Sequence, residues 1–481
     1  DRAVIVYTNL IKRYFKDTKP IVLGGIEASL RRITHYDYWT DKLRAPILFD
    51  SKADFLLYGM ADSSVVELAR ALKEKRSLLE IRGLCYLAKT PPEKYIILPS
   101  FEETVADRDE FIRMYQLFYE NNDPITANGL AQQKGDRWLV QNPPTLTLNQ
   151  AQLDKTHGLN YEHDQHPYYE QQGEVKALET IRFSIPTHRG CYGECNFCAI
   201  AVHEGRTVTW RSETSILAEA ESLTRHPKFK GIIQDLSGPT ANMYGFECVK
   251  KLTRGVCPDK RCVFPQICPV LKIDHQNQIN LLKKVRQIPG IKKVFVGSGI
   301  RYDMVLADRQ NGLSYLKEIA AHHTSGQLKV APEHADPLVL QMMGKPPVAS
   351  LLDFKEKFES FSRQAGKEQY LTYYLIAAYP GCGDKEMKYL KKFVTEKLRL
   401  TPEQVQIFTP TPSTYASVMY YTEKNPFTGE ALFVEKRIAG KLMQKEILAS
   451  PATETPRKPT GMRRLQKSGY AKKTPPRERT K

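Results

Sequence analysis

The chain has 481 residues, of which 41% are apolar and 26% charged, and these proportions exclude a fully disordered or fibrous protein. At about 150 residues per domain, the length predicts roughly three domains. No run of about 18 uncharged apolar residues occurs, so no membrane span is expected. The first residues do not form a signal peptide, which predicts a cytoplasmic protein, and the start at Asp1 without an initiator Met is expected of a fragment.

About half of the formal net charge of +17 lies in a carboxy-terminal tail. Between Pro456 and Lys481, ten Lys or Arg residues stand against one acid, Glu478. This tail is rich in Pro, Lys, Arg and Thr and nearly devoid of apolar residues, so it is predicted to be disordered. It is either a solubilising tail or an arm that binds nucleic acid, because clustered cations bind phosphates without sequence preference.

Residues 1–95 are predicted to alternate between helices and short apolar strands. A helix ends near residue 15, strands cover 20–25 and 53–60, and a helix capped by Ser63 or Ser64 follows. This alternation is typical of a parallel α/β sheet. Residues 96–178 are turn-rich and polar, and they are predicted to form an irregular connector. His157, His163 and His166 lie there and are interpreted as surface residues rather than as a metal site.

The alternation returns in residues 179–430. Six strand–helix units predict a partial or complete (β/α) barrel, whose functional groups gather at the carboxyl ends of the strands. Ser212 is expected to cap the helix that follows it. The strands are expected within 179–190, 231–238, 291–299, 327–334, 369–381 and 403–412. Residues 431–481 form an extension that ends in the basic tail.

Three of the nine cysteines, Cys191, Cys195 and Cys198, have the spacing C-x3-C-x2-C. Three thiolates on a short loop can hold three corners of a cubic [4Fe–4S] cluster and leave one iron open. A structural zinc site usually has four ligands, and a thioredoxin-like centre has two cysteines, so both alternatives fit less well. Gly190 permits a tight turn before this loop, and the ring of Phe197 either covers the bound cofactor or packs within the loop.

A second group has the spacing C-x4-C-x5-C. Cys257, Cys262 and Cys268 are predicted to lie close together, as a second metal site or as structural residues in an irregular, Pro-rich turn.

The segment CYGECNFC resembles the CxxxCxΦC loop of radical S-adenosylmethionine (SAM) enzymes, in which Φ is aromatic. The segment GRTVTWRSETSILAEAESL is similar to the one that follows this loop in methylthiotransferase-like members. Six further stretches resemble the YgiQ-type radical SAM proteins over residues 1 to about 430. They are HRGCYGECNFCAI, QDLSGPTANMYG, SGIRYD, LKVAPEH, YPGC and TPTPSTYASVMYYT.

This resemblance implies that Cys191, Cys195 and Cys198 hold a [4Fe–4S] cluster and that SAM chelates the open iron. An electron from the cluster would cleave SAM to methionine and a 5′-deoxyadenosyl radical, which would abstract a hydrogen from an unidentified substrate. The resemblance assigns no further catalytic residue. It implies an electron donor such as flavodoxin or ferredoxin. The alternative function is an iron–sulfur scaffold, or a nucleic-acid-binding protein with a structural cluster.

Six polar or turn residues are expected to contact SAM at the strand ends. Gly238 and Pro239 occupy the place of the Gly-Gly-Glu that meets the SAM amino group in family members, without its carboxylate. Arg301 has a fork of donors that suits a carboxylate. Each of these side chains could instead form a salt bridge or a strand-end cap. The full set is Gly238, Pro239, Ser298, Arg301, Lys329 and Glu333.

Residues 1–95 look like a truncated Rossmann-like domain of the cobalamin-binding type, of which they form the latter half. Gly24 and Gly25 would match the nucleotide-contacting glycines of that family, or they simply form a turn at a strand end. The earlier part of the pattern, with any cobalt-ligating His, is missing from this chain. Cobalamin binding is therefore doubtful.

Overall fold

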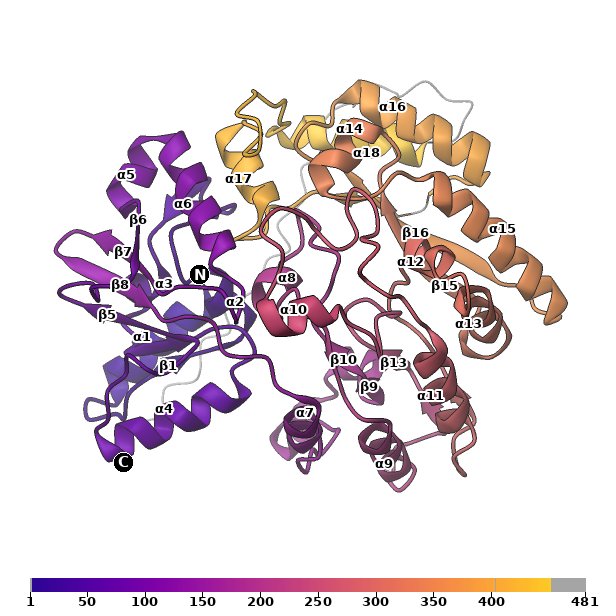
Figure 1. Ribbon diagram of the computed structural model, residues 1–481, viewed down its shortest axis with the longest axis horizontal. Coiled ribbons are helices and arrows are strands. Elements are labelled where there is room, and N and C mark those ends of the chain that lie inside the picture. The colour runs from indigo at the N-terminus through magenta and orange to yellow at the C-terminus, as the bar shows by residue number, and fades with distance from the viewer. Residues whose placement is uncertain (1, 403, 451–481) are drawn as a thin grey trace, which may run out of the picture.

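The structure is a computed structural model that describes residues 2–402 and 404–450. Figure 1 shows an amino-terminal unit built around one sheet, beside a second unit with further strands and helices. The strands of the first unit are β1 (Val22–Leu23), β2 (His35–Asp37), β3 (Lys42–Arg44), β4 (Phe55–Leu57), β5 (Leu84–Ala88), β6 (Ile96–Leu98), β7 (Leu130–Lys134) and β8 (Arg137–Gln141). Its helices are α1 (Ala3–Tyr14), α2 (Gly25–Leu30), α3 (Ile47–Ser51), α4 (Asp62–Glu74), α5 (Phe101–Ala106) and α6 (Arg108–Glu120).

The amino-terminal sheet is mixed rather than parallel. Its six strands have the order β1-β4-β5-β8-β7-β6, and only the outer pairs β1/β4 and β6/β7 are parallel. The alternation in residues 1–95 predicted a parallel sheet, which holds for β1/β4 but not for the antiparallel centre; the strands β6 and β7 lie where a connector was expected. The β7–β8 connection explains part of the difference, because only Gly135 and Asp136 separate these strands, and a two-residue link joins antiparallel neighbours.

The secondary structure of residues 96–178 differs from the expected irregular connector. Three strands and two helices of the sheet unit lie between residues 96 and 141. Helix α6 buries Phe111, Met114, Tyr115 and Phe118, a helical spacing that the turn-rich flanking sequences obscured. Only the later part, with α7 (Gln150–His157) and the short 3₁₀ helices η1 (Pro167–Gln172) and η2 (Lys176–Thr180), is largely irregular.

The two predicted helix caps have different outcomes. Helix α4 begins at Asp62, so Ser63 and Ser64 lie inside it and the cap prediction is wrong. The Ser64 hydroxyl instead contacts the Thr145 hydroxyl at 2.7 Å. The prediction for Ser212 is confirmed, because its side chain accepts a hydrogen bond from the Ser215 amide in the first turn of α9 (Glu213–Leu223).

The second unit consists mainly of parallel strands that alternate with helices, together with one antiparallel pair. Its strands are β9 (Ser184–Pro186), β10 (His188–Arg189), β11 (Thr209–Trp210), β12 (Ile232–Ile233), β13 (Asp235–Ser237), β14 (Lys293–Val294), β15 (Gln327–Glu333), β16 (Tyr370–Ala377) and β17 (Gln406–Ile407). Its helices, besides α7 and α9, are α8 (Ile200–His203), α10 (Val249–Arg254), α11 (Gln276–Arg286), α12 (Tyr302–Ala307), α13 (Gly312–Glu318), η3 (Ile319–His323), α14 (Pro337–Met343), α15 (Ala349–Gln364), α16 (Asp384–Phe393), η4 (Val394–Leu398), α17 (Tyr415–Thr422) and α18 (Ile438–Ala449).

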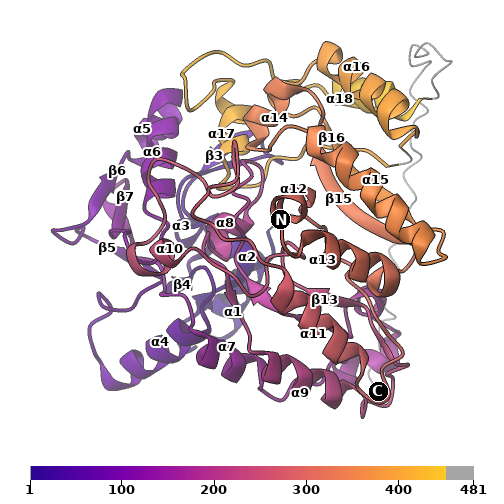
Figure 2. The same cartoon turned by 45° about the vertical axis from the view of Figure 1, so that its right-hand side comes forward.

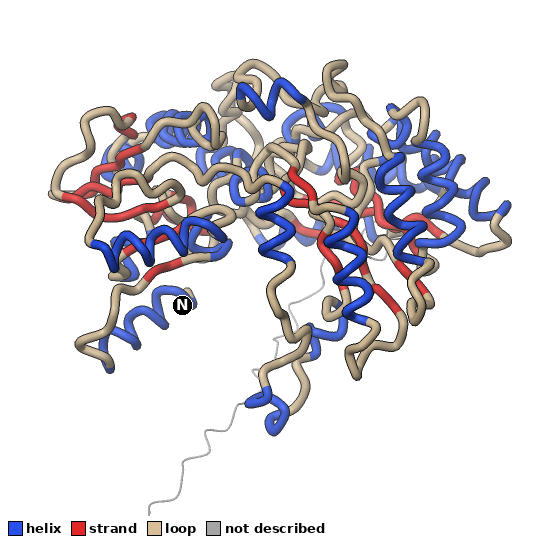
Figure 3. The backbone as a smooth tube through the Cα atoms, turned by 60° about the horizontal axis from the view of Figure 1, so that its bottom comes forward, coloured by secondary structure: helices blue, strands red, loops and turns tan. Residues whose placement is uncertain are grey.

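These strands form a parallel run in sequence order. Strand β9 pairs with β13, β12 pairs with β14, a parallel bridge joins Ile300 to Val330, and β15, β16 and β17 follow. Figure 2 places α11, α13 and α15 in succession along this run, and Figure 3 shows helices on the outer side of the strands. The predicted strand–helix alternation is confirmed. Within residues 2–402 and 404–450, no pairing of β17 with β9 closes the run into a complete barrel.

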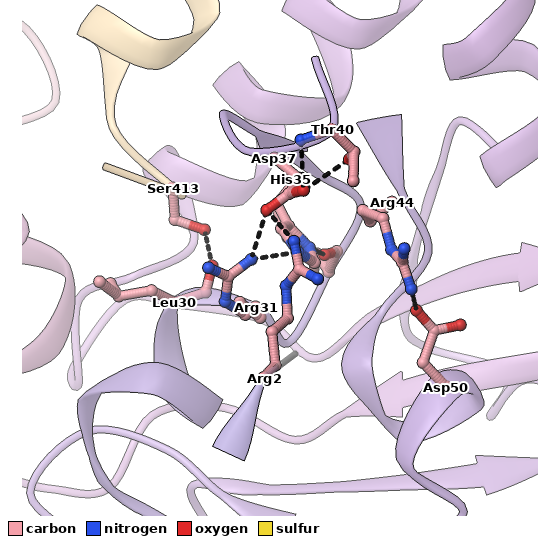
Figure 4. Close-up of polar contacts among 10 residues, drawn as sticks. Arg2, Leu30, Arg31, His35, Asp37, Thr40, Arg44, Asp50 and Ser413 are labelled. Atoms are coloured by element: carbon pink, nitrogen blue, oxygen red, sulfur yellow. Dashed lines mark hydrogen bonds and ion pairs between the residues drawn. The ribbon is translucent and has the colours of Figure 1, made fainter. Parts of the chain in front are cut away.

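The two units are joined by contacts near Ser413. The Ser413 hydroxyl donates to the Leu30 carbonyl at 2.8 Å, as Figure 4 shows, and the Tyr115 hydroxyl donates to the Ser413 carbonyl at 3.1 Å. Tyr115 of α6 also packs edge-on against Tyr415 of α17, with ring centroids 4.8 Å apart. Helix α17 therefore covers the apolar face of α6.

Beside this junction, the buried carboxylate of Asp37 gathers three polar groups (Figure 4). It pairs with Arg2 and Arg31 and accepts hydrogen bonds from Thr40. Burial alone would raise the pKa of Asp37, but the hydrogen bonds from Arg2 and Thr40 lower it to about 2. The charge is therefore compensated inside the fold.

Two further expectations concern membrane-spanning helices and the basic tail. No helix among the described residues is both long enough and apolar enough to cross a membrane. The basic tail from Pro456 to Lys481 lies outside the described residues.

Candidate active site

The cysteine loop leaves β10 through a turn that only glycine fits. Gly190 has φ of +84°, and a Cβ built on it would lie 2.2 Å from the Thr207 carbonyl oxygen. That oxygen belongs to the segment entering β11, which pairs with β10. The predicted tight turn at Gly190 is therefore present, and it directs the loop toward the parallel strands.

The loop brings the three cysteines to one cavity. Cys191, Cys195, Cys198 and Phe197 all line a space of about 700 Å³ that is partly open to solvent. Most of the rest of the lining comes from the carboxyl ends of the parallel strands and the segments that follow them, where such sites are expected. These residues are Gly193, Ile200, Pro239, Thr240, Gly299, Ile300, Arg301, Tyr302, Asp303, Ala331, Glu333, Lys345 and Pro346.

The sulfur atoms lie against small and polar groups. Cys191 Sγ lies 3.3 Å from the Thr240 hydroxyl and accepts a hydrogen bond from the Gly193 amide at 3.3 Å. A Cβ on Gly193 would lie 3.2 Å from Cys191 Sγ and 3.6 Å from Cys195 Sγ. Burial raises the pKa of Cys191, and it raises the pKa of Cys198 to about 12, so without a metal these groups are thiols.

A buried arginine lies against this loop in the cavity. The Arg301 guanidinium donates to Asp303 through Nε and Nη2, with Nε 2.9 Å from Asp303 Oδ1. Its Nη1 has no hydrogen-bond partner among the described residues and lies 3.4 Å from the Cβ position of Gly193. A buried donor without a partner is costly, so this atom is positioned for an anionic ligand.

Glu333 supplies an acceptor in the same cavity. Its Oε2 is buried without a hydrogen-bond partner in the described part of the chain, while Oε1 lies 4.0 Å from Lys345 Nζ. Burial raises the pKa of Glu333 to about 7, although the charge of Lys345 acts in the opposite direction. The residue reaches the cavity because the β15/β16 register shifts between Val330 and Glu333.

Of the other residues expected to contact SAM, only one lines the cavity. Pro239 lines the cavity, whereas Gly238 packs against His188, whose ring atoms would lie 2.5 Å from a Cβ on Gly238. The Ser298 hydroxyl donates to Asp235 Oδ2 at 2.5 Å and is not part of the cavity lining. Ser298 therefore makes a contact at the strand ends, which was the alternative to a contact with SAM. Lys329 is exposed and does not line the cavity, because it alternates with the buried residues Leu328 and Val330 on β15. The expectation that it faces the same mouth is wrong.

Four polar residues of the cavity were not predicted from the sequence. Thr240 and Asp303 lie within the stretches QDLSGPTANMYG and SGIRYD, so the resemblance already pointed to these segments. Tyr302 also belongs to SGIRYD. Lys345 follows α14, and its Nζ donates to the Ala331 carbonyl at 2.7 Å, a contact that no local pattern indicates.

The cavity fits the group that the cysteine spacing predicts. No set of three or more His, Cys, Asp or Glu side chains in the described ranges converges as on a single metal ion. A cubic cluster instead takes its thiolates at separate corners, and three of them here line one cavity. The unpartnered Arg301 Nη1 and Glu333 Oε2 complement a ligand that carries both a carboxylate and donor groups, as SAM does.

Comparisons with known proteins give relatives along most of the chain. A family model described as "Radical SAM N-terminal" matches residues 1–184, and a "Domain of unknown function (DUF3362)" matches residues 403–449. A UPF0313 protein of Fusobacterium nucleatum is 56% identical over 93% of this chain and 79% of its own length. UPF0313 proteins of Thermotoga neapolitana and Clostridium perfringens are 44% and 43% identical over 93% of this chain, and over 78% and 68% of their own lengths.

Two solved structures are similar at a lower level. The radical SAM methyltransferase TsrM of Kitasatospora setae, with cobalamin and a [4Fe–4S] cluster bound, matches with a TM-score of 0.47 at 15% identity. The cobalamin-dependent radical SAM enzyme OxsB, with aqua-cobalamin and SAM bound, matches with a TM-score of 0.49 at 13% identity. These alignments cover 87% and 92% of this chain, which spans 60% and 45% of the two enzymes.

Proposed function

The chain belongs to the UPF0313 family of YgiQ-type radical SAM proteins, and from this premise we propose that it is an enzyme that uses a [4Fe–4S] cluster to cleave SAM reductively. One observation carries the proposal. Cys191, Cys195 and Cys198 line the same cavity as the two unpartnered polar atoms of Arg301 and Glu333. A structural cluster would not require such groups beside it.

The residues of the cavity have separate roles in this proposal. The three cysteines hold three irons, and the absence of a fourth cysteine from the lining leaves one iron for the ligand. Arg301 Nη1 donates to the carboxylate of SAM, while Asp303 keeps the guanidinium fixed. Glu333 Oε2 accepts a hydrogen bond from the amine or a ribose hydroxyl of SAM.

When bound, the cluster would supply the electron that breaks a C–S bond of SAM, which yields methionine and a 5′-deoxyadenosyl radical. The chain's own contribution is orientation and exclusion of water. Ile300, Ala331 and Pro346 give the cavity an apolar side, and Phe197 packs near Tyr379 with ring centroids 6.2 Å apart. We further propose a flavodoxin- or ferredoxin-type protein as the electron donor.

The experiment uses anaerobically reconstituted full-length protein with dithionite and SAM. Release of 5′-deoxyadenosine, quantified by liquid chromatography and mass spectrometry, is the expected result for the wild type. Cys195→Ala should release none, because the cluster loses one of three ligands. Cys85→Ala is the matched control: it removes a buried thiol from β5, outside the cavity, and should keep the activity.

Two outcomes contradict the proposal. The first is unchanged 5′-deoxyadenosine release by Cys195→Ala. The second is a wild-type cluster whose electron paramagnetic resonance does not change when SAM is added, which would favour an iron–sulfur scaffold instead.

A further inference from the structure

A second group of cysteines lies together outside the candidate active site. Cys257, Cys262 and Cys268 line one small cavity, and Cys248, which is remote from them in sequence, completes the group. Four of the nine cysteines of the chain therefore face one space. All four are free thiols.

The three later cysteines lie in an irregular segment between α10 and α11. Cys248 precedes the first turn of α10, and the other three follow that helix. The Cys268 amide donates to the Cys262 carbonyl at 2.8 Å, and the Leu271 amide donates to the Cys268 carbonyl at 3.0 Å. These bonds fold the loop back on itself, so that thiols up to 20 positions apart face one space.

The surroundings of the four thiols are cationic. Lys250, Lys251, Lys260 and Arg261 line the same cavity, and none of the described lining residues is an acid. Lys251 Nζ lies 3.5 Å from Cys262 Sγ. Four thiolates on an iron–sulfur cube leave a net negative charge, and cations around a buried anion offset the cost of removing it from water. Two of these cations, Lys250 and Lys260, are exposed, and Lys251 also pairs with the Glu247 carboxylate at 3.2 Å. Neutral thiols would not require the Lys251 ammonium beside Cys262.

A cluster fits this arrangement better than a single ion. Zinc binds thiolates at about 2.3 Å, so two sulfurs on one zinc lie within about 4 Å of each other. No group in the described part of the chain converges in this way, whereas the four cysteines surround a cavity of about 430 Å³. We infer that Cys248, Cys257, Cys262 and Cys268 bind a second [4Fe–4S] cluster, one with a complete set of four protein ligands.

The second cysteine loop also contacts the first. Arg261 donates to the Glu194 carbonyl at 2.9 Å and to the Asn196 side chain at 2.8 Å, two positions between the cysteines of the first loop. Lys251 Nζ lies 4.6 Å from the centre of the Tyr192 ring, next to Cys191. Cys191 and Cys248 belong to the same buried apolar cluster. The two centres are thus neighbours, separated by Tyr192 and its contacts.

The test is an iron and sulfide count on anaerobically reconstituted full-length protein. The wild type should contain about eight irons and eight sulfides per chain, as expected for two [4Fe–4S] clusters. The triple variant Cys191→Ala, Cys195→Ala, Cys198→Ala should keep about half of both and should release no 5′-deoxyadenosine. Its remaining electron paramagnetic resonance signal should not change with SAM, because no iron is open.

The complementary variant Cys257→Ala, Cys262→Ala should keep about half of the iron and the SAM-sensitive signal. Cys382→Ala, which removes a buried thiol from neither group, should keep the full content. A wild-type content of about four irons would overturn the inference without any variant, and so would zinc without iron in the triple variant. If the wild type contained about eight irons but did not cleave SAM, only the proposed function would be contradicted. The failure of the second cluster and the failure of the proposed function are therefore distinguishable.

Discussion

Replacing Gly190 by Ala tests how the cysteine loop is held. The new Cβ would lie 2.2 Å from the carbonyl oxygen and 3.0 Å from the carbonyl carbon of Thr207, and 3.3 Å from Val208 Cα. All three are backbone atoms, so no side-chain rotation relieves the contact. Relief requires the β10/β11 pair to separate, and with it the start of the loop that carries Cys191.

The expected loss of stability has two parts. An Ala at φ of +84° costs about 1–2 kcal/mol for the left-handed backbone. Forcing atoms into a packed site costs about 1–3 kcal/mol more, which gives about 2–5 kcal/mol in all. Gly366→Ala is the matched control, because Gly366 has φ of +66° in the same unit and no atom within 4 Å of its Cβ position. It should lose only the first part, about 1–2 kcal/mol.

The free energy of unfolding of both variants and the wild type would be measured by urea titration, with the iron content determined on the same samples. Gly190→Ala should lose more stability than Gly366→Ala and should alone bind less iron. Equal losses in the two variants, with full iron content in both, would refute the account of the close backbone approach at Gly190.

Three further outcomes follow from the site. Gly193→Ala adds no left-handed strain but crowds Cys191 Sγ at 3.2 Å, so reconstituted protein should hold less iron while its free energy of unfolding changes by less than about 1 kcal/mol. Burial lowers the pKa of His188 to about 4, so its contribution to stability is present above about pH 6.5 and is lost as the pH falls toward 4. The loss amounts to about 2 kcal/mol at pH 5, and His188→Gln should flatten the unfolding free energy between pH 6.5 and 5. Arg301→Lys removes the forked contact with Asp303 and the free Nη1, so SAM affinity, titrated by the change in cluster resonance, should fall about tenfold or more; an unchanged affinity would exclude a contact with SAM.

The sequence predicted the parts of the site that depend on local chemistry. The spacing of Cys191, Cys195 and Cys198 and the need for a turn at Gly190 are properties of nine consecutive residues. Lys345 could not be found in this way, since it enters the cavity only through the fold around α14. Lys329 was misplaced for the opposite reason: it lies in a quoted motif, yet strand alternation directs it outward.

The fold was predicted to a similar extent. The β/α alternation after residue 179 is visible in the sequence itself, because short apolar strands alternate with helices, of which α11, α15 and α16 are clearly amphipathic. The antiparallel centre of the first sheet depends on long-range pairings such as Leu84 to Leu57 and Cys85 to Gln141, which composition does not specify. The contribution of Cys248 to the second cysteine group has the same origin, since the fold and not the spacing brings it there.

The contact between α6 and α17 has a consequence for synthesis on the ribosome. Tyr115 and its hydrogen-bond partner Ser413 are 298 positions apart. At about 5–20 residues per second, the apolar face of α6 would wait roughly 15–60 s for the segment that covers it. During that interval Phe111 and Tyr115 have no native cover from α17, and the nascent chain is exposed to aggregation or to capture by chaperones. The amino-terminal unit therefore reaches its final packing only when translation has passed the last strand of the second unit.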